Sequence, residues 1–288
     1  MVQYTYSSHR TRHIEKIRKQ RVKYPQVAKN IVDTSDIILE ILDTRYAKKM
    51  RNPELEKEIS KQKKQIIFVL NKSDLSMKEK TEATKKQLKP SIIISCAKRR
   101  GIKELRDLIK RLAKNIENPE KREIRKDKVI FGEDKRIKVG VIGYPNTGKS
   151  SLINLLAGKS AAGVGAEAGY TKNIQKIKLS ENIVLIDSPG VIPDKHYSMT
   201  EQEKISTHSI FGGKSYTQIK EPDLVVHQLM QEFPEIIQKH YKIKAQDSEE
   251  LIEKIGRMKG FLKRGDRVNE DQAAREIIRA WQMGEIRI

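Results

Sequence analysis

Two stretches of the chain carry side chains whose types and spacing suit the binding of a purine nucleotide. The first follows the apolar run QIIFVL, where Asn71, Lys72 and Asp74 form an Asn-Lys-x-Asp arrangement, here called the guanine box. The Asp74 carboxylate can accept hydrogen bonds from N1–H and the 2-amino group of guanine, and adenine has neither donor there. An unpaired carboxylate costs about 1 to 3 kcal/mol or more, and Lys72 can lay its aliphatic stem along the base. The guanine box therefore predicts a preference for guanine over adenine.

The second stretch is GYPNTGKS, residues 143–150, which fits the pattern G-x-x-x-x-G-K-[ST] and is here called the phosphate loop. Its glycines let backbone N–H groups approach phosphates, Lys149 neutralises the β and γ oxygens, and Ser150 is placed to ligate Mg²⁺. An apolar run, IKVGVIG, precedes the loop, and a helical pattern, KSSLINLLAG, follows it, as this function requires. The predicted phosphate contacts are Gly143, Tyr144, Pro145, Asn146, Thr147, Gly148, Lys149, Ser150 and Ser151.

Two weaker motifs gain weight because they follow the phosphate loop at suitable positions. In DSPG, which ends an apolar run, Asp187 would hold Mg²⁺ through water and the N–H of Gly190 would contact the γ-phosphate. Thr171 lies in the Gly-rich segment between the loop and DSPG, where a switch threonine would coordinate Mg²⁺ and the γ-phosphate. Neither motif would carry this interpretation alone.

A third weak motif, SCAK, ends the apolar run that follows the guanine box. We expect Ala97 to offer its backbone N–H to the guanine carbonyl and Lys98 to pack beside the base. Cys96 belongs to the same segment and is expected to be a small packed residue rather than a nucleophile. These three residues complete the predicted guanine site.

Short apolar runs rich in β-branched residues alternate with helical patterns along the first two thirds of the chain, which implies a parallel sheet covered on both faces. One helix is expected to begin with Asn52 as N-cap and Pro53 at its first position. Another carries a single apolar stripe, made of Leu105, Leu108, Ile109 and Leu112. The predicted strands are residues 36–43, 65–71, 91–95, 137–143 and 181–190.

After residue 215 the strand pattern ends, and helices are expected near residues 222–240, 248–259 and 269–283. Asn269 and Gly284 would cap the last helix at its two ends. Trp281 lies on its apolar stripe, so we expect it in the core rather than as a base-stacking platform. The predicted organisation is a basic arm (1–30), an α/β domain (31–215) with an internal linker (117–136), and a small all-helical domain (216–288).

The order of the motifs along the chain is guanine box, SCAK, phosphate loop, Thr171 and DSPG. In an ordinary GTPase the phosphate loop comes first, so this order indicates a circular permutation, which a polar linker permits because the ends of compact domains often lie close together. The chain resembles the circularly permuted GTPases of the YlqF/RbgA group, whose members assist assembly of the large ribosomal subunit. LDTRYAKKMRNP and GFLKRGDRVNEDQAAREIIRAWQMGEI also resemble segments of that group. The resemblance implies a permuted P-loop α/β fold that binds GTP and GDP with Mg²⁺, hydrolyses GTP, and carries a helical RNA-binding domain.

Three features bear on how hydrolysis would proceed. The group has a histidine in PGHM that is proposed to act in hydrolysis; here the nearest candidates are His9 and His13, which could instead contact RNA from an exposed basic arm. Val191 follows Gly190 where ordinary GTPases have a water-orienting glutamine, and an apolar side chain cannot position water. Asn146 resembles an asparagine that helps to coordinate K⁺ near the phosphates, the alternative being that it only stiffens the loop. We therefore expect slow hydrolysis by the isolated protein and stimulation by ribosomal particles.

The formal net charge of +21, from 59 Lys and Arg against 38 Asp and Glu, favours a polyanionic partner. Part of the excess is clustered in residues 9–24, which favours nucleic acid, and a Lys-rich thermophilic proteome is the alternative explanation. Contacts to rRNA phosphates are predicted for a cationic set in the helical region. This set is Arg257, Lys259, Lys263, Arg264, Arg267, Arg275 and Arg279.

Several features bear on where the protein works. No apolar run approaches the roughly 20 residues that span a bilayer, the first residues lack the apolar core of a signal peptide, and a single cysteine permits no internal disulfide. We expect a cytoplasmic monomer whose partners are rRNA and precursors of the large ribosomal subunit, with no membrane. The alternatives are a GTPase that acts on the small subunit or on tRNA, and a non-hydrolysing RNA-binding module with structural GTP.

Overall fold

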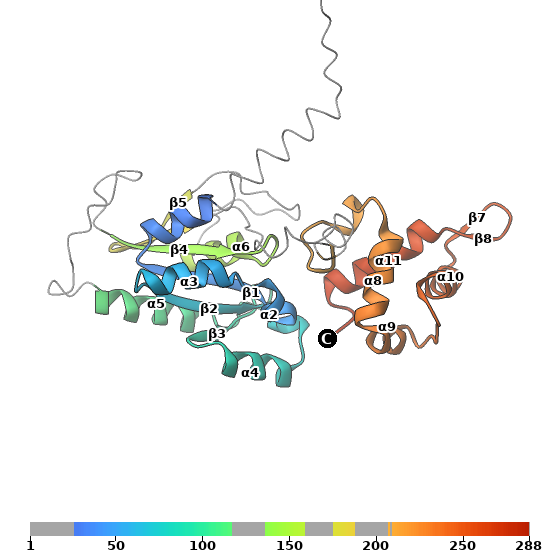
Figure 1. Ribbon diagram of the computed structural model, residues 1–288, viewed down its shortest axis with the longest axis horizontal. Helices are drawn as coiled ribbons and strands as arrows, with labels where there is room; N and C mark the ends of the chain where they lie inside the picture. The colour runs from blue at the N-terminus through green and yellow to red at the C-terminus, as the bar shows by residue number, and fades with distance from the viewer. Residues whose placement is uncertain (1–25, 117–135, 159–174, 188–206, 208, 288) are drawn as a thin grey trace, which may run out of the picture.

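The computed structural model describes residues 26–116, 136–158, 175–187, 207 and 209–287. In these residues a six-stranded sheet lies at one end of the molecule and a group of helices at the other (Figure 1). The sheet has the strand order β3-β2-β1-β4-β6-β5. Its strands are β1 (Ile37–Asp43), β2 (Gln65–Asn71), β3 (Ser91–Ile93), β4 (Ile137–Gly143), β5 (Gln175–Ser180) and β6 (Ile183–Asp187).

β1 occupies the middle of the sheet and pairs in parallel with both β2 and β4, so that Ile37 lies opposite Gln65 on one side and Val139 on the other. All seven residues of β1 are buried, because helices cover both faces of the sheet. The five predicted strands are confirmed, although the third ends at Ile93 and the fifth covers only Ile183–Asp187.

The sheet is parallel, as predicted, except at one edge. β5, which the sequence pattern did not predict, runs antiparallel to β6. In β5, Ile177 is buried, whereas Lys176 and Lys178 are exposed. An edge strand of an antiparallel pair needs to bury only one face, so β5 lacks the continuous apolar run of the inner strands.

Two layers of helices enclose the sheet. On one face α5 (Ile102–Ile116) and α6 (Lys149–Ala157) pack against β1, β2 and β4, with Leu105 and Ile109 of the predicted stripe fully buried. On the other face lie α3 (Pro53–Lys61) and the helical residues 26–34, whose Ile31 packs on the sheet. The Asn52 side chain accepts from the Leu55 N–H at 3.2 Å, which confirms the predicted N-cap. The short helices α2 (Ala47–Met50) and α4 (Lys78–Gln87) follow β1 and β2.

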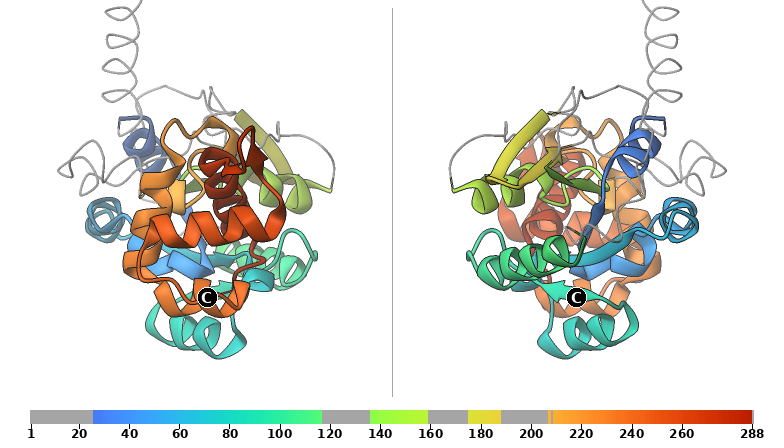
Figure 2. Two further views of the ribbon diagram at one scale, coloured as in Figure 1. Left: turned by 90° about the vertical axis from the view of Figure 1, so that its right-hand side faces the viewer. Right: turned by 90° about the vertical axis from the view of Figure 1, so that its left-hand side faces the viewer.

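The C-terminal helices stack against the carboxyl ends of the central strands (Figure 2). They are α8 (Pro222–Glu232), α9 (Pro234–Tyr241), α10 (Ser248–Lys259) and α11 (Glu270–Met283). One apolar cluster contains Leu42, Leu70 and Tyr144 of the sheet region together with Trp281 of α11, so both parts of the chain share a core. Trp281 is fully buried and donates from its indole N–H to the Ile210 carbonyl at 3.2 Å, as its place on the apolar stripe predicts.

Two details of the helical region differ from the sequence-based prediction. The helix expected at 222–240 is divided at Phe233, because Pro234 lacks the N–H needed to continue a helix and begins α9 instead. The region is also not wholly helical, since β7 (Leu262–Lys263) and β8 (Arg267–Val268) form a hairpin between α10 and α11. Its turn uses Gly265 and Asp266, both at positive φ, and its strands are too short to show a period.

Candidate functional site

The guanine box begins with Asn71, the last residue of β2, and the Asn71 side chain contacts two other segments. The Asn71 side chain is almost fully buried. Its Nδ2 donates to the Thr147 carbonyl of the phosphate loop at 2.7 Å, and its Oδ1 accepts from the Cys96 N–H at 3.1 Å. Asn71 is therefore a positioning residue that holds the guanine box, the phosphate loop and SCAK together.

Asp74 is oriented by a residue that the sequence analysis did not single out. The Ser95 hydroxyl donates to Asp74 Oδ1 at 2.5 Å and accepts from the Lys98 N–H at 3.0 Å. Ser95 is fully buried, so its hydroxyl holds one oxygen of Asp74 from the protein side, while Asp74 itself is half-buried. Its place in SCAK, at the end of the strand next to β2, is the signal that could have revealed it.

The Cys96 thiol is partly buried and packs against the apolar cluster of the sheet, as expected for a small packed residue. Burial, the largest influence, raises its pKa to about 12, so it is protonated at neutral pH. A thiol in that state is a poor nucleophile. Ala97 and Lys98, the next two residues, are exposed beside the guanine box, and their predicted contacts to a base stay predictions.

The phosphate loop connects β4 to α6 in the strand-to-helix arrangement that its motif requires. Gly143 and Gly148 have φ of 148° and 97°. A Cβ on Gly143 would lie 2.4 Å from the Ile41 carbonyl oxygen, and one on Gly148 would lie 2.3 Å from Asn71 Nδ2. The loop passes so close to its neighbours that only glycine fits, and this keeps its backbone open to an anion at the N-terminus of α6.

Lys149 is the first residue of α6, directly after Gly148, and its side chain is buried. Its ammonium group donates to the carbonyls of Gly143 at 3.1 Å and Tyr144 at 2.8 Å. Burial lowers the pKa of Lys149 to about 8, with Asp187 acting in the opposite direction. A cation so placed has a strong electrostatic reason to bind a phosphate.

Ser150 and Asp187 meet at the edge of the phosphate loop, where the Ser150 hydroxyl donates to Asp187 Oδ2 at 3.1 Å. A hydroxyl and a carboxylate are oxygen ligands of the kind that Mg²⁺ takes together with waters and substrate phosphates. Among the described residues, no group of three or more His, Cys, Asp or Glu side chains could hold a metal by itself. The donor set therefore fits Mg²⁺ bound with a nucleotide. Thr171, Gly190, Val191, His9 and His13 lie outside the described residues.

Asn146 contacts the segment that leads into the C-terminal helices. It adopts a left-handed backbone with φ of 58°, and its Nδ2 donates to the Gly212 carbonyl at 2.5 Å. The side chain therefore links the phosphate loop to residues 209–216. From sequence, Asn146 was expected either to help coordinate K⁺ or only to stiffen the loop. Both remain predictions, and its contact with Gly212 was not predicted.

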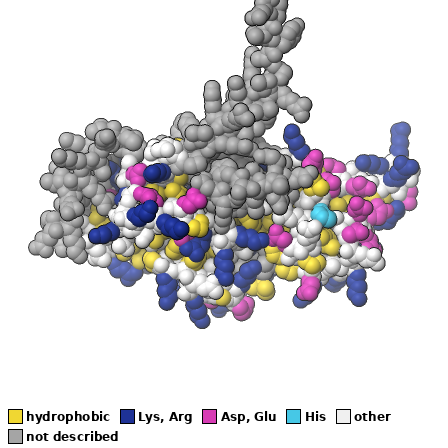
Figure 3. Space-filling view, in the orientation of Figure 1, with side chains coloured by type: hydrophobic (Ala, Val, Ile, Leu, Met, Phe, Trp, Pro, Cys, Tyr) yellow, Lys and Arg dark blue, Asp and Glu magenta, His cyan; other side chains and the backbone are white. Residues whose placement is uncertain are grey.

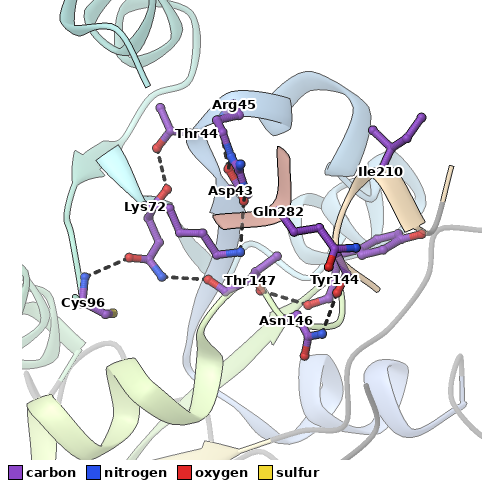
Figure 4. A network of polar contacts seen from close by, with 12 residues as sticks. Asp43, Thr44, Arg45, Lys72, Cys96, Tyr144, Asn146, Thr147, Ile210 and Gln282 are labelled. Atoms are coloured by element: carbon purple, nitrogen blue, oxygen red, sulfur yellow. Dashed lines mark hydrogen bonds and ion pairs between the residues drawn. The ribbon is translucent and has the colours of Figure 1, made fainter. Parts of the chain in front are cut away.

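A second network of ion pairs and hydrogen bonds, which was not predicted from the sequence, surrounds Asp43 next to the guanine box. Lys72 has a left-handed backbone, and its ammonium group lies 3.1 Å from Asp43 Oδ2 at the end of β1. Asp43 also accepts two hydrogen bonds from the Arg45 guanidinium group, at 3.0 and 2.8 Å, and one from the Arg45 backbone N–H at 3.1 Å. The neighbouring Thr44 hydroxyl donates to the Asn71 carbonyl at 2.6 Å (Figure 4). The resemblance noted for LDTRY implied no role for these residues, and the structure places them directly beside the guanine box.

These elements surround one cleft of about 1110 Å³. Asn71, Lys72 and Asp74 line it together with Asn146 and Gly148, so the guanine box and the phosphate loop face the same space. Met283, at the end of α11, lines it as well. A base at the guanine box and phosphates at the loop could therefore belong to one nucleotide.

The seven predicted rRNA contacts lie around α10, the β7–β8 hairpin and α11, and they differ in their surroundings. Lys263, Arg264 and Arg267 are exposed on the hairpin. The other cations are close to acids: Arg257 bonds to Glu253 and Asp266, Arg275 to Asp271, and Arg279 to Glu276 and Glu285, while Lys259 lies 4.0 Å from Glu276. Figure 3 shows acidic and basic side chains intermingled at this end of the molecule. Within the described part of the chain the three hairpin cations make no ion pair, and the role of the whole set stays a prediction.

Comparison with known proteins agrees with the geometry. The family model described as a 50S ribosome-binding GTPase matches residues 138–261. An uncharacterised GTP-binding protein of Methanocaldococcus jannaschii is 33% identical over 273 residues, covering 94% of this chain and 68% of that protein. The GTPase grn1 of Schizosaccharomyces pombe is 29% identical, with 92% of this chain and 61% of its own length covered. A guanine nucleotide-binding protein-like 3 homolog of Caenorhabditis elegans is also 29% identical, and the chain spans only 49% of it.

Solved structures share the fold. GDP-bound TM YlqF aligns over 90% of this chain and 95% of its own, with a TM-score of 0.60 and 22% identity. GNP-bound YlqF from T. maritima aligns with a TM-score of 0.59, also at 22% identity, over 93% of this chain and 94% of its own. No helix among the described residues is long and apolar enough to cross a membrane.

Proposed function

Because the chain belongs to the circularly permuted GTPases of the YlqF/RbgA group, we propose that it is a GTP-hydrolysing assembly factor for the large ribosomal subunit that binds rRNA in a nucleotide-dependent manner. The observation that carries this proposal is that the guanine box and the phosphate loop line the same cleft. The cytoplasm is the compartment we propose, and a monomer the working form. The fold and the binding of GTP follow from the family, whereas the subunit and the RNA are the proposal.

Guanine is selected by Asp74, with its carboxylate held by the Ser95 hydroxyl. A carboxylate fixed in this way faces the N1–H and 2-amino donors of guanine without further ordering. Asn71 binds no base in this scheme, because both ends of its amide are already bonded to the protein. It sets the distance between the base and the phosphates.

Hydrolysis depends on charge stabilisation at the phosphates. Mg²⁺, held by Ser150 and Asp187 together with Thr171, would neutralise charge on the β and γ oxygens. Lys149 lies in the same loop. When a nucleotide binds, its ammonium group would give up its hydrogen bonds to the Gly143 and Tyr144 carbonyls and donate to phosphate oxygens instead. Gly190 is followed by Val191, so the chain has no polar side chain there to orient water, and the isolated protein should hydrolyse GTP slowly.

Asn146 is our candidate for a K⁺ contact near the phosphates. Its amide nitrogen donates to Gly212, which turns the amide oxygen away from that carbonyl. K⁺ should then accelerate hydrolysis more than Na⁺ does, and Asn146→Ala should remove the difference. Equal rates in the two salts for the wild type would leave Asn146 as a loop residue only.

Docking on rRNA is assigned to the basic arm and to the exposed hairpin cations Lys263, Arg264 and Arg267. A net charge of +21 makes binding to RNA strongly dependent on salt, with close to one unit of log-log slope for each neutralised phosphate. Once docked, an rRNA group, His9 or His13 would supply what Val191 lacks. Docking and hydrolysis are thereby coupled.

The test is GTP hydrolysis measured with purified large and small ribosomal subunits at low salt, together with sedimentation of the protein in the presence of GTP or GDP. We expect stimulation of at least tenfold by large subunits only, since a missing positioning group typically costs about two powers of ten in rate. A variant with Lys263, Arg264 and Arg267 changed to Gln should lose stimulation. The control changes the exposed Lys78, Lys85 and Lys86 of α4 to Gln, which removes the same charge.

Three other outcomes would contradict the proposal. An unchanged rate with intact GTP binding would favour a structural role for GTP. Stimulation by small subunits or by tRNA would redirect the function to those partners. Equal loss in the hairpin variant and in the α4 control would indicate non-specific attraction rather than a docking surface.

A further inference from the structure

The last turn of α11 borders the nucleotide cleft, although it lies far from every nucleotide motif in the sequence. Gln282 and Met283 line the same cleft as Lys72 and Asp74. The next residue, Gly284, is buried at φ of 75°, and a Cβ there would lie 2.5 Å from Leu75 Cδ2. Leu75 directly follows Asp74, so the end of α11 is packed against the guanine box.

A buried polar connection joins the same two places. Arg45 Nη1 donates to the Trp281 carbonyl at 3.0 Å, while its Nε and Nη2 donate to Asp43. Asp43 in turn holds the Lys72 ammonium group at 3.1 Å. Burial alone would raise the pKa of Asp43, but Lys72 and Arg45 lower it to about 2, so the network stays charged. A cation on the carbonyl end of a helix is also favoured by the helix dipole.

The two residues of α11 that face the cleft have different roles. Gln282 has already used its amide: it donates to the carbonyls of Ser209 at 2.8 Å and Lys214 at 2.9 Å, and accepts from the Tyr216 N–H at 3.1 Å. Its role is to hold residues 209–216 against α11. Met283 is 56% exposed in the cleft, and its flexible thioether can pack on the flat face of a base or on a sugar.

We propose that the last turn of α11 is a wall of the guanine-nucleotide site, with Met283 in contact with the nucleoside and Arg45 as the positioning residue that holds this turn beside Lys72. The inference rests on the proposed binding of GTP and GDP in this cleft. It implies that nucleotide binding and the docking of α11 stabilise each other, because a coupling between two sites acts equally in both directions. The helical region is then part of the binding site as well as an attached domain.

The first experiment is calorimetric titration of the full chain with GDP for the wild type, Met283→Ala and Met258→Ala. Met258 is the matched control, since it is 52% exposed in α10 and does not line the cleft. Met283→Ala should weaken GDP about threefold to tenfold, as expected for one side chain partly removed from the contact, whereas Met258→Ala should bind as the wild type does. Equal affinity of all three proteins would overturn the role of Met283.

The second experiment measures amide hydrogen exchange with and without GDP, comparing residues 279–287 with α10 as an internal reference. GDP should protect the end of α11 more than α10, ADP should not, and Met283→Ala should reduce the difference. Arg45→Lys keeps the charge but loses the three-pronged contact, so it should lower both GDP affinity and this protection. A residue with only a stabilising role would lower the melting temperature and leave both unchanged.

The outcomes separate the inference from the function on which it rests. If the wild type binds GDP but protects α11 and α10 equally, the inference fails and the GTPase assignment stands. If the wild type binds neither GDP nor GTP, both fail together. Trp281 is the only tryptophan of the chain, so a shift of its fluorescence on GDP binding should accompany the protection.

Discussion

Gly148 and Gly158 stand at the two ends of α6 and form a matched pair for testing how tightly the phosphate loop is packed on the guanine box. Their φ angles are 97° and 72°, so alanine at either position would meet a backbone penalty of about 1 to 2 kcal/mol. A Cβ at Gly158 would meet no described atom within 4 Å, whereas one at Gly148 would lie 2.3 Å from Asn71 Nδ2. Both substitutions therefore carry the backbone penalty, but only Gly148→Ala also creates a steric clash.

The extra effect of Gly148→Ala follows from what Asn71 loses when it moves. Its side chain bonds to the Thr147 carbonyl at 2.7 Å and to the Cys96 N–H at 3.1 Å, in a site where Asn71 is 2% exposed. A buried polar group left without a partner costs about 1 to 3 kcal/mol. Gly148→Ala should therefore lower the free energy of unfolding by about 2 to 5 kcal/mol, against about 1 to 2 kcal/mol for Gly158→Ala.

Urea unfolding of the nucleotide-free protein, followed by circular dichroism, measures both stability changes. GDP calorimetry at a temperature where both variants are folded measures the effect on binding. Gly148→Ala should weaken GDP by at least about tenfold, because displacement of Asn71 also disturbs the segment that orients Asp74. Equal unfolding free energies and equal GDP affinities for the two variants would refute the assigned role of Asn71.

Three further predictions concern the base and the phosphates. The wild type should prefer GTP to ATP by at least about a hundredfold, on the order of 3 kcal/mol, and calorimetry should show Asp74→Asn shifted toward xanthine nucleotides; equal wild-type affinity for ATP and GTP would end the guanine interpretation. Ser95→Ala should weaken GDP about tenfold, with Ser91→Ala, whose hydroxyl bonds to the exposed Lys85 carbonyl, as control. Since the folded pKa of Lys149 is lowered to about 8 from 10.5, the unfolded chain binds more protons between these values. The free energy of unfolding of the wild type should therefore rise between pH 8 and 10.5 relative to that of Lys149→Met, by about 3 kcal/mol at most. Parallel pH profiles of the unfolding free energy for the two proteins would contradict this.

The sequence by itself was sufficient for the motifs whose chemistry is local. The guanine box, the phosphate loop and SCAK each lie at the end of an apolar run. These runs form the parallel strands β2, β4 and β3, so their carboxyl ends lie on the same side of the sheet. Such motifs are readable because neighbouring residues on one loop or helix end do the chemistry together. Trp281 was also placed correctly in the core, since the period of α11 shows its buried face.

Prediction was weaker where the pattern was short or depended on a neighbour. β5 is an edge strand that carries two exposed lysines, and the β7–β8 hairpin has strands of two residues each. The break at Phe233 depends on Pro234, a residue that both ends one helix and suits the start of the next. In each case the local sequence is compatible with more than one secondary structure, and packing against the surrounding residues determines which one forms.

Contacts between segments far apart in the chain were decided only by tertiary structure. Arg45 meets the Trp281 carbonyl, 236 positions later, and Asn71 meets Thr147, 76 positions later. A single arginine or methionine shows no sequence pattern that identifies its partner. The contact of Arg45 with the Trp281 carbonyl and the place of Met283 in the cleft could therefore not be predicted from sequence. Motifs whose residues are neighbours in sequence can be identified from sequence alone. The position of the α11 end beside the guanine box, in contrast, depends on how the shared core packs.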